Sequence, residues 1–279
     1  MPQLGELALE EPAMTDEFAS SELISFRLDG RLAIITGASE GIGRTFAHAF
    51  CLAGAEVVLV GRRHEVLQNV HREISAMGGK AHVVCADLTR LDDIRSLEES
   101  VLKLIENTQK KLVLVNNAGF AFTKAALDVT EDDWDRVLDL HVKGTFFCSQ
   151  RIGRLMIDCR YGKIINLSST WSVSTDVGKS VYGVAKAAIS YLTAGLSTEW
   201  ASSGVRVNAI APCTTLSENT LQHVQQNPAR SERMLQRIQL GRFAAPADLA
   251  GAAVFLASPA SDFITGHTLF VDGGWHAGR

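Results

Sequence analysis

A glycine-rich turn between a strand and a helix constrains the fold of this chain more than any other feature. The run RLAIIT (Arg31–Thr36) is apolar and β-branched, so it predicts a short buried strand. TGASEGIG follows from Thr36, and the residues after it, up to Gly54, have a helical pattern. Gly37, Gly41 and Gly43 would let the backbone turn tightly and approach a pyrophosphate at the positive end of that helix. We therefore predict a dinucleotide-binding turn; the alternative is a glycine-rich turn without a ligand.

Apolar strand patterns alternate with helix-length amphipathic segments along the rest of the chain. Further strands are predicted at AEVVLV (55–60), AHVVCADL (81–88), KLVLVNNAG (111–119), GKIINLSS (162–169), GVRVNAIAP (204–212) and HTLFVDGG (267–274). A long helix is predicted over Glu131–Arg160 and another over Val181–Ser203. Such alternation specifies an α/β fold, a doubly wound parallel sheet of the Rossmann type. The 279 residues, 46% of them hydrophobic, suffice for one such domain, and no repeat suggests a second.

Two stretches lie outside this alternation. Residues 1–27 are acidic, contain two prolines, and lack the basic start and apolar run of a signal peptide. We expect them to form a flexible arm that packs on a neighbouring subunit. Residues 213–240 are polar, with mixed charges, and we expect a mobile lid over a site. The dinucleotide-binding catalytic domain is then expected to span residues 28–279.

The residues after the second strand bear on the choice of cofactor. Gly61, Arg62 and Arg63 stand where a dinucleotide fold approaches the adenosine ribose. An acidic residue there would bind a 2′-hydroxyl, whereas arginines can pair with a 2′-phosphate. This favours NADP over NAD, although Glu40 in the glycine turn would oppose the phosphate. The alternative is that both arginines are solvated and the cofactor is NAD.

The third and fourth strands end in residues suited to a cofactor cleft. Asp87 and Leu88 are placed to flank an adenine ring. Asn116 and Asn117 can tie neighbouring loops together, and after them Ala118 and Gly119 leave room for a cofactor. The alternative for the asparagine pair is a capped turn.

Three polar side chains follow the fifth strand. Ser169 ends that strand, while Tyr182 and Lys186 are four residues apart, so on a helix they share one face. A free tyrosine has a pKa of about 10, and we expect the Lys186 ammonium to lower it toward the range useful for a base. Ser169 can position a substrate oxygen by a hydrogen bond. The set suits proton transfer at a carbonyl or alcohol oxygen; alternatively, Tyr182 and Lys186 are ordinary helix-surface residues.

Charge and cysteine content exclude several classes of protein. A net charge of −4 gives no electrostatic reason to bind nucleic acid or an anionic membrane. No apolar run approaches the roughly 18 residues of a transmembrane helix. The five cysteines are scattered, and no Cys/His cluster has metal-ligand spacing, so we expect no metal site. A reducing, cytoplasmic setting fits this pattern.

Taken together, the motifs resemble those of the short-chain dehydrogenase/reductase family from about Leu28 to Gly274. TGASEGIG, Asp87-Leu88, NNAG, Ser169 and YGVAK occur in the family's order. The resemblance implies an NAD(P)-dependent oxidoreductase in which Tyr182 is the general acid/base, Lys186 binds the nicotinamide ribose and Ser169 orients the substrate. It also implies homo-oligomers, tetramers or dimers, that pair their long helices. The cofactor contacts that it implies are Gly37, Ser39, Gly41, Ile42, Asp87, Leu88, Asn117 and Thr215.

Two positions depart from the family pattern. The family has asparagine before VKG in the long helix, where it holds a water linked to the catalytic lysine; this chain has His141. His141 is either a buried histidine satisfied by a backbone carbonyl or a proton-relay element that replaces the asparagine. The family also has Pro-Gly after the sixth strand, whereas Cys213 follows Pro212 here, and cysteine adopts positive φ less readily than glycine.

These observations predict an NADP-dependent oxidoreductase that interconverts a ketone and a secondary alcohol by hydride transfer. We expect a small polar substrate, such as a sugar acid or a polyol. One alternative is a 3-oxoacyl thioester reductase. An alternative of another class is a sensor or scaffold that binds NADP without turnover.

Overall fold

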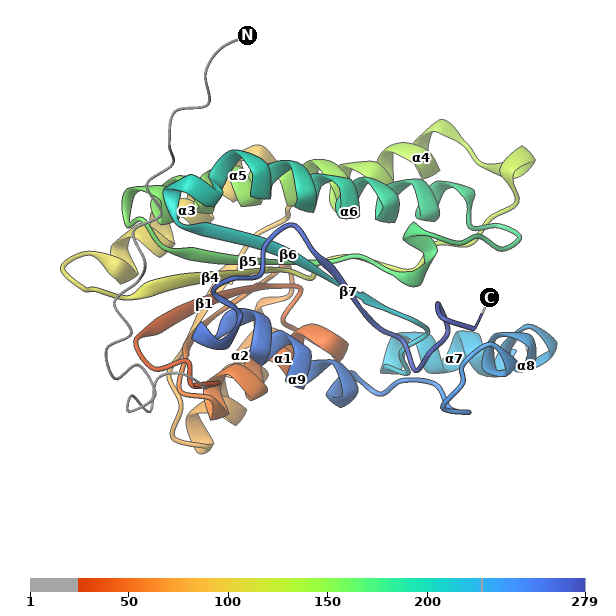
Figure 1. The fold of residues 1–279 in the computed structure, drawn as a ribbon, viewed down its shortest axis with the longest axis horizontal. Helices are drawn as coiled ribbons and strands as arrows, with labels where there is room; N and C mark the ends of the chain where they lie inside the picture. The colour runs from red at the N-terminus through yellow and green to blue at the C-terminus, as the bar shows by residue number, and fades with distance from the viewer. Residues whose placement is uncertain (1–24, 227, 279) are drawn as a thin grey trace, which may run out of the picture.

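A seven-stranded parallel sheet forms the centre of the molecule (Figure 1). The computed structural model describes residues 25–226 and 228–278. The strand order is β3-β2-β1-β4-β5-β6-β7, so the order reverses between β1 and β4. The strands are β1 (Arg31–Thr36), β2 (Glu56–Gly61), β3 (Ala81–Cys85), β4 (Lys111–Asn116), β5 (Gly162–Leu167), β6 (Val205–Pro212) and β7 (Thr268–Val271). The predicted doubly wound α/β fold is confirmed.

Helices cover both faces of the sheet, which explains why the strands are apolar on both sides. In Figure 1, α3, α4, α5 and α6 lie above the sheet, and α1, α2 and α9 lie below it. Along β1, Ala33 and Ile35 pack in the core with α1, α2 and α9, whereas Leu32 and Ile34 pack in the core with α3, α5 and α6. The helices are α1 (Gly41–Leu52), α2 (His64–Ala76), α3 (Leu91–Ile105), α4 (Glu131–Leu138), α5 (Thr145–Asp158), α6 (Ser180–Trp200), α7 (Glu218–Gln226), α8 (Pro228–Gln236) and α9 (Pro246–Ala257).

The long helix predicted over Glu131–Arg160 is interrupted by wider turns. Helix α4 passes into a π-helical segment at Asp139–Gly144 before α5 begins. A π-helical segment shifts the phase of the side chains that follow it, and such segments often occur at functional sites. This one contains His141, which is buried.

The segment that we predict to be a lid contains two helices. Helices α7 and α8 lie at the end of the sheet near the C-terminus (Figure 1). Their motion stays a prediction. Residues 1–24 of the predicted N-terminal arm lie outside the described residues. Among the rest of that arm, the Phe26 ring packs near Phe255, with ring centroids 6.1 Å apart.

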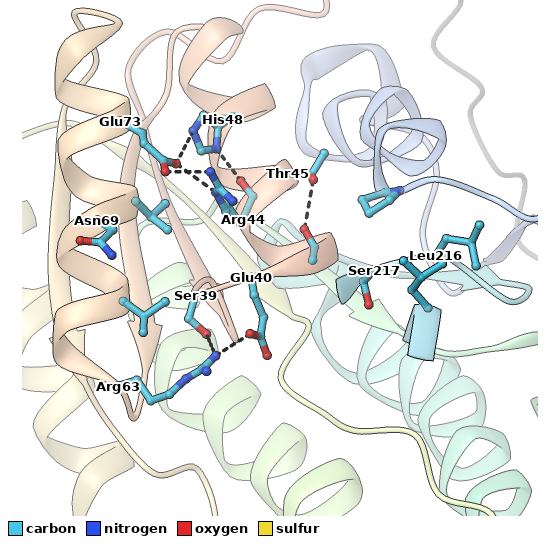
Figure 2. Close-up of a pocket in the computed structure, with 15 residues that line it drawn as sticks. Ser39, Glu40, Arg44, Thr45, His48, Arg63, Asn69, Glu73, Leu216 and Ser217 are labelled. Carbon is cyan, nitrogen blue, oxygen red and sulfur yellow. Dashed lines mark hydrogen bonds and ion pairs between the residues drawn. The ribbon is translucent and has the colours of Figure 1, made fainter. Parts of the chain in front are cut away.

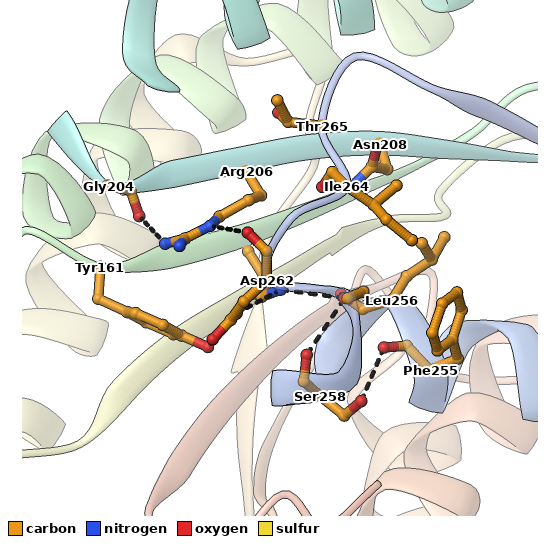
Figure 3. Close-up of polar contacts among 12 residues, drawn as sticks. Tyr161, Gly204, Arg206, Asn208, Phe255, Leu256, Ser258, Asp262, Ile264 and Thr265 are labelled. Carbon is orange, nitrogen blue, oxygen red and sulfur yellow. Dashed lines mark hydrogen bonds and ion pairs between the residues drawn. The ribbon is translucent and has the colours of Figure 1, made fainter. Parts of the chain in front are cut away.

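A polar cluster joins the strands to the loop after α9, far along the sheet from the carboxyl strand ends. The Asp262 carboxylate accepts a hydrogen bond from the Tyr161 hydroxyl (3.1 Å) and pairs with the buried Lys163 ammonium (2.7 Å). Figure 3 shows Arg206 between Gly204 and Asp262, where Arg206 Nε donates to the Asp262 carbonyl (2.9 Å). Burial lowers the pKa of Lys163 to about 8, against the opposing effect of Asp262. The cluster gives the buried Lys163 ammonium its hydrogen-bond partners, so we assign it a structural role at this end of the sheet.

No helix in the described ranges is both long and apolar enough to cross a bilayer.

Candidate active site

A cavity of about 950 Å³ opens where the strands end. Open α/β sheets bind ligands at this place, outside the carboxyl ends of the strands where the order reverses. Every site residue expected from the sequence lines the cavity, and the structure therefore brings all of them together. They are Gly37, Ser39, Glu40, Gly41, Ile42, Arg62, Arg63, Asp87, Leu88, Asn117, Ala118, Gly119, Thr215, His141, Ser169, Tyr182 and Lys186.

The glycine turn has the conformation that its sequence predicts. Gly37 and Gly41 have φ of +66° and +55°, a region that other residues rarely adopt. Gly43 needs its hydrogen for a different reason, since a Cβ there would lie 2.2 Å from the Gly37 carbonyl oxygen. Helix α1 begins at Gly41, so its free backbone N–H groups and positive end lie at the cavity.

Asn117 and Thr36 lock the glycine turn to the end of β4. The Asn117 amide donates to the carbonyls of Thr36 (2.9 Å) and Gly37 (3.2 Å). The Thr36 hydroxyl accepts from the backbone N–H groups of Asn117 and Ala118, both at 3.0 Å. The predicted tie between neighbouring loops is confirmed for Asn117, but not for Asn116, whose amide donates to Ser149 on α5 and Asn166 on β5, both at 2.8 Å. Thr36 was missed because its role depends on a loop about 80 residues away in the chain.

Arg63 lies at the outer end of the cavity with an acidic partner. Its guanidinium pairs with Glu40 (2.7 Å) and donates to the Ser39 hydroxyl (3.1 Å), as Figure 2 shows. Arg62 is more exposed and lies 4.0 Å from Asp87. Arg63 is therefore held toward the glycine turn rather than simply solvated. Glu40 is close enough to compete with a phosphate for it.

A second hollow of about 810 Å³ lies beside the same turn, lined by α1 and α2 and also by Leu216, Ser217, Leu221 and Pro246. Arg44 bridges the two helices there by donating two hydrogen bonds to Glu73, at 2.9 and 2.7 Å. His48 lies 3.2 Å from the same carboxylate. These pairs hold α1 against α2 and thereby position the turn.

Tyr182 and Lys186 lie on one face of α6, with Ser169 opposite, two residues beyond the end of β5. The Lys186 ammonium lies 5.6 Å from the centre of the Tyr182 ring and donates to the Leu167 carbonyl (2.6 Å). Burial lowers the pKa of Lys186 to about 8. Burial also raises the pKa of Tyr182 to about 12, although the Ser169 hydroxyl opposes the rise.

The expected lowering of the Tyr182 pKa is therefore wrong for the protein without a ligand. The desolvation of the phenolate outweighs the hydrogen bond with Ser169, and the same burial disfavours the charge of Lys186. In this state Tyr182 is protonated near neutral pH, which is the form that has a proton to donate to a substrate oxygen.

His141 contacts the backbone of the loop after β4. Its Nε2 lies 3.0 Å from the Phe120 carbonyl oxygen, to which it donates in one tautomer, and 3.3 Å from the Phe120 nitrogen. Its ring meets the Tyr182 ring edge-on, with centroids 5.6 Å apart. Burial, and then the charge of Lys186, lower the pKa of His141 to about 3, so it is neutral. The expectation of a buried histidine bonded to a backbone carbonyl is confirmed, and a relay role stays a prediction.

Cys213 takes its place after β6 without backbone strain. The non-glycine residues with positive φ, within the described ranges, are Asn107 and Arg160, so Cys213 avoids that region. Burial, helped by Asp272, raises the pKa of its thiol to about 11. The departure from Pro-Gly is accommodated, and the thiol is protonated near neutral pH.

Three cations that the sequence gave no reason to choose also line the cavity: Arg136 of α4, Lys179 and Arg230. Lys179 precedes α6, three residues before Tyr182, and Arg230 lies in α8. The three-residue spacing was the only available signal for Lys179. Arg230 lay in a segment expected to be a lid, with no motif around it.

No grouping of three or more His, Cys, Asp or Glu side chains that could hold a metal ion occurs among residues 25–226 and 228–278.

Comparison with known proteins agrees with this geometry. A protein-family model described as enoyl-(acyl carrier protein) reductase, one of the short-chain dehydrogenase/reductase models, matches residues 37–276. The chain belongs to the short-chain dehydrogenase/reductase family. The resemblance seen in the motifs is thereby confirmed.

Relatives within the short-chain dehydrogenase/reductase family differ in substrate. The 2-dehydro-3-deoxy-D-gluconate 5-dehydrogenase of Dickeya dadantii is 37% identical over 258 residues, which cover 91% of this chain and 99% of the relative. A 3-oxoacyl-[acyl-carrier-protein] reductase of Synechocystis is 36% identical over 252 residues, which cover 88% of this chain and 97% of the relative. The crystal structure of a gluconate 5-dehydrogenase from Burkholderia cenocepacia, in complex with NADP and tartrate, is similar with a TM-score of 0.86. It is 34% identical and covers 91% of this chain and 98% of that one.

Proposed function

We propose that this protein is an NADP-dependent oxidoreductase that interconverts a ketone and a secondary alcohol on a small polar substrate, such as a sugar acid or a polyol. The observation that carries the proposal is the convergence of Ser169, Tyr182 and Lys186 in the cavity that also contains the glycine turn. The 2-dehydro-3-deoxygluconate and gluconate dehydrogenases among the relatives support the substrate class.

The residues of the cavity fit NADP. The N-terminus of α1 at Gly41 would hold the pyrophosphate, and Arg63, Ser39 and Arg62 offer donors for a 2′-phosphate. Asp87, Leu88 and Thr215 line the same cavity, as expected for cofactor contacts. NADP, when bound, accepts or supplies the hydride.

Tyr182 holds the proton that the substrate oxygen gains or loses. In the reducing direction its protonated phenol donates to the oxygen, which Ser169 positions by a hydrogen bond. In the oxidising direction Tyr182 must act as a base, and the Lys186 ammonium then stabilises the phenolate. Lys186 is held in place for this by the Leu167 carbonyl.

His141 is proposed to help the proton reach solvent. Its neutral ring lies between the Phe120 backbone and the Tyr182 ring, and Nε2 is the nitrogen near Phe120. Neutral imidazole has a lone pair on its other nitrogen when Nε2 carries the hydrogen, so it can accept from a water. In this role His141 would replace the amide that the family has at this position.

A substrate screen tests the proposal against its rivals. Sugar acids and polyols are offered to the purified protein with NADP or NAD, and 3-oxoacyl thioesters with NADPH or NADH. The absorbance of the reduced cofactor, which rises in the first case and falls in the second, is followed. Turnover of a sugar acid or polyol with NADP is the expected result. NADP binding without turnover of any class would instead support a sensor or scaffold, and preference for the thioester would support the reductase alternative.

We also propose a homo-oligomer in which long helices of neighbouring subunits pair. Large apolar side chains are exposed on these helices: Trp134 on α4, and Val184 and Tyr191 on α6. Exposed apolar patches of this kind commonly mark subunit contacts. Light scattering after size-exclusion chromatography tests this, and a monomer at micromolar concentration would contradict it. The five free cysteines fit a reducing, cytoplasmic location.

A further inference from the structure

Positively charged side chains line the substrate end of the cavity, and the acidic side chains that line it lie at the other end. Lys179, Arg230 and Arg136 line it there, beside Tyr182 and Lys186. The acidic residues that line the cavity, within the described part of the chain, are Glu40 and Asp87, and both lie at the adenosine end.

Lys179 is buried yet has hydrogen-bonding capacity to spare. It is 7% exposed, and its ammonium donates to the Phe122 carbonyl (2.9 Å) and the Thr123 hydroxyl (2.7 Å). An ammonium has three N–H donors, and no third acceptor bonds it among residues 25–226 and 228–278. The ammonium lies 5.1 Å from the centre of the Tyr182 ring and 6.0 Å from that of Trp171, so it is close to the reacting position.

Arg230 brings a second cation to the same place from a different element. It lies in α8 and pairs with Asp176 at 3.2 Å, and Asp176 does not line the cavity. Burial lowers the pKa of Lys179 to about 8, and the nearby charge of Arg230 lowers it further while Asp176 opposes this. Two neighbouring positive charges destabilise each other, and an anion bound in the cavity between them would offset that repulsion.

We propose that Lys179 and Arg230 bind the carboxylate of the substrate, and that the enzyme acts on small hydroxy or oxo acids in preference to uncharged polyols and oxoacyl thioesters. This rests on the proposed dehydrogenase function and names its substrate class. A polyol would leave Lys179 and Arg230 with Asp176 as their shared counter-ion, and an acyl chain would place methylenes against the Lys179 ammonium. The apolar wall of Trp171 and Met234 strengthens the attraction between a carboxylate and these cations.

A structural role alone does not account for Lys179. The hydrogen bonds to Phe122 and Thr123 tie the loop after β4 to the start of α6, and a neutral amide could make such bonds at less desolvation cost. Within the described ranges the Arg230 guanidinium bonds to Asp176 rather than to that loop, so the two cations can be tested separately.

The experiment compares acids with polyols of the same carbon chain. The probes are D-gluconate, D-galactonate and 2-dehydro-3-deoxy-D-gluconate as acids, with D-glucitol and galactitol as polyols, each assayed with the full chain and NADP or NADPH. The variants are Lys179→Met, Lys179→Gln and Arg230→Gln. Lys103→Met is the matched control, since this lysine is exposed on α3 and distant from the cavity. Circular dichroism and thermal unfolding verify that each variant is folded.

The wild type should prefer acids, and each of the three variants should lower kcat/KM for acids about 10- to 100-fold, mainly through KM, as expected for loss of a hydrogen bond to a charged group. Activity on polyols should fall less than activity on acids in the same variants, so the ratio of kcat/KM for acids to kcat/KM for polyols should drop. A wild type that uses polyols as well as acids would overturn the carboxylate site and leave the dehydrogenase proposal standing, as would equal losses on both classes. A protein that turns over neither class would overturn the proposed function, and this inference with it.

Discussion

Replacing Glu40 by glutamine should strengthen the preference for NADP. The Glu40 carboxylate lies 2.7 Å from the Arg63 guanidinium, in a pair whose side chains are 33% and 53% exposed. Such a pair contributes at most about 1 kcal/mol to stability, so the variant should fold normally. With the carboxylate removed, Arg63 can give its hydrogen bonds to the 2′-phosphate alone. One such charge-assisted bond is worth about 1.5–3 kcal/mol, so the Kd for NADPH should fall about tenfold or more.

The assay is a titration that follows the fluorescence of NADPH and NADH as they bind. It compares the wild type with Glu40→Gln, with Arg63→Ala, and with two double variants, Glu40→Gln/Arg63→Ala and Arg62→Ala/Arg63→Ala. Arg63→Ala should weaken NADPH binding about tenfold or more, and the additional loss of Arg62 should bring the effect to tens-fold. Binding of NADH should change by less than about threefold, because it has no 2′-phosphate. The benefit of Glu40→Gln should disappear in the Arg63→Ala background, since the two residues act through one contact. A wild type that binds NADH as tightly as NADPH, or a Glu40→Gln variant with an unchanged ratio, would refute this reasoning.

Two further predictions concern His141 and the glycine turn. His141 has a pKa of about 3 in the fold and about 6.5 in the unfolded chain, so the unfolded chain binds more protons between these values. Denaturant titrations should show the wild type losing about 1.4 kcal/mol of unfolding free energy per pH unit below about 6 relative to His141→Asn; parallel profiles would contradict this. His141→Leu should lower turnover but keep NADP affinity, and unchanged turnover across the pH range would mean a purely structural role. Gly43→Ala should lower the free energy of unfolding by about 1–3 kcal/mol and weaken NADP binding, because its Cβ would meet Gly37. The control is Gly251→Ala in α9, where a Cβ would meet nothing, and it should be neutral or slightly stabilising. Equal effects of the two substitutions would count against the turn geometry.

The fold could be predicted from the sequence because its main determinants are local. The β-branched runs specify strands that are buried on both faces, and the glycine turn specifies a helix that starts at the cavity. The predicted strands extended past the observed ends, as at Ala86–Leu88 and Ser168–Ser169, since the residues that leave the sheet are still apolar or small. The π-helical turns at Asp139–Gly144 had no signal in the sequence. Gly144 of this segment lies close to the loop after β3, since a Cβ there would be 2.7 Å from the Leu88 carbonyl oxygen.

Site residues that lie close together in the sequence could be predicted from motifs. Site residues that come to the cavity from separate elements were missed. Tyr182 and Lys186 share a helix, so their spacing was sufficient to pair them. Arg230 comes to the cavity from α8, and no pattern within α8 predicts that approach. The direction of the Tyr182 pKa was also wrong, because the desolvation of a buried phenol can be judged only when the surrounding atoms are known.

The most direct test of the central claim is the turnover of Tyr182→Phe, measured beside the wild type with NADP and a substrate that the wild type uses. Phenylalanine keeps the ring and removes only the hydroxyl that transfers the proton. Turnover should fall by about 10²- to 10⁴-fold, the range for lost general acid/base catalysis, while the Kd for NADP stays the same. Near-normal turnover in this variant, with NADP still bound, would contradict the assignment of Tyr182 and the mechanism built on it.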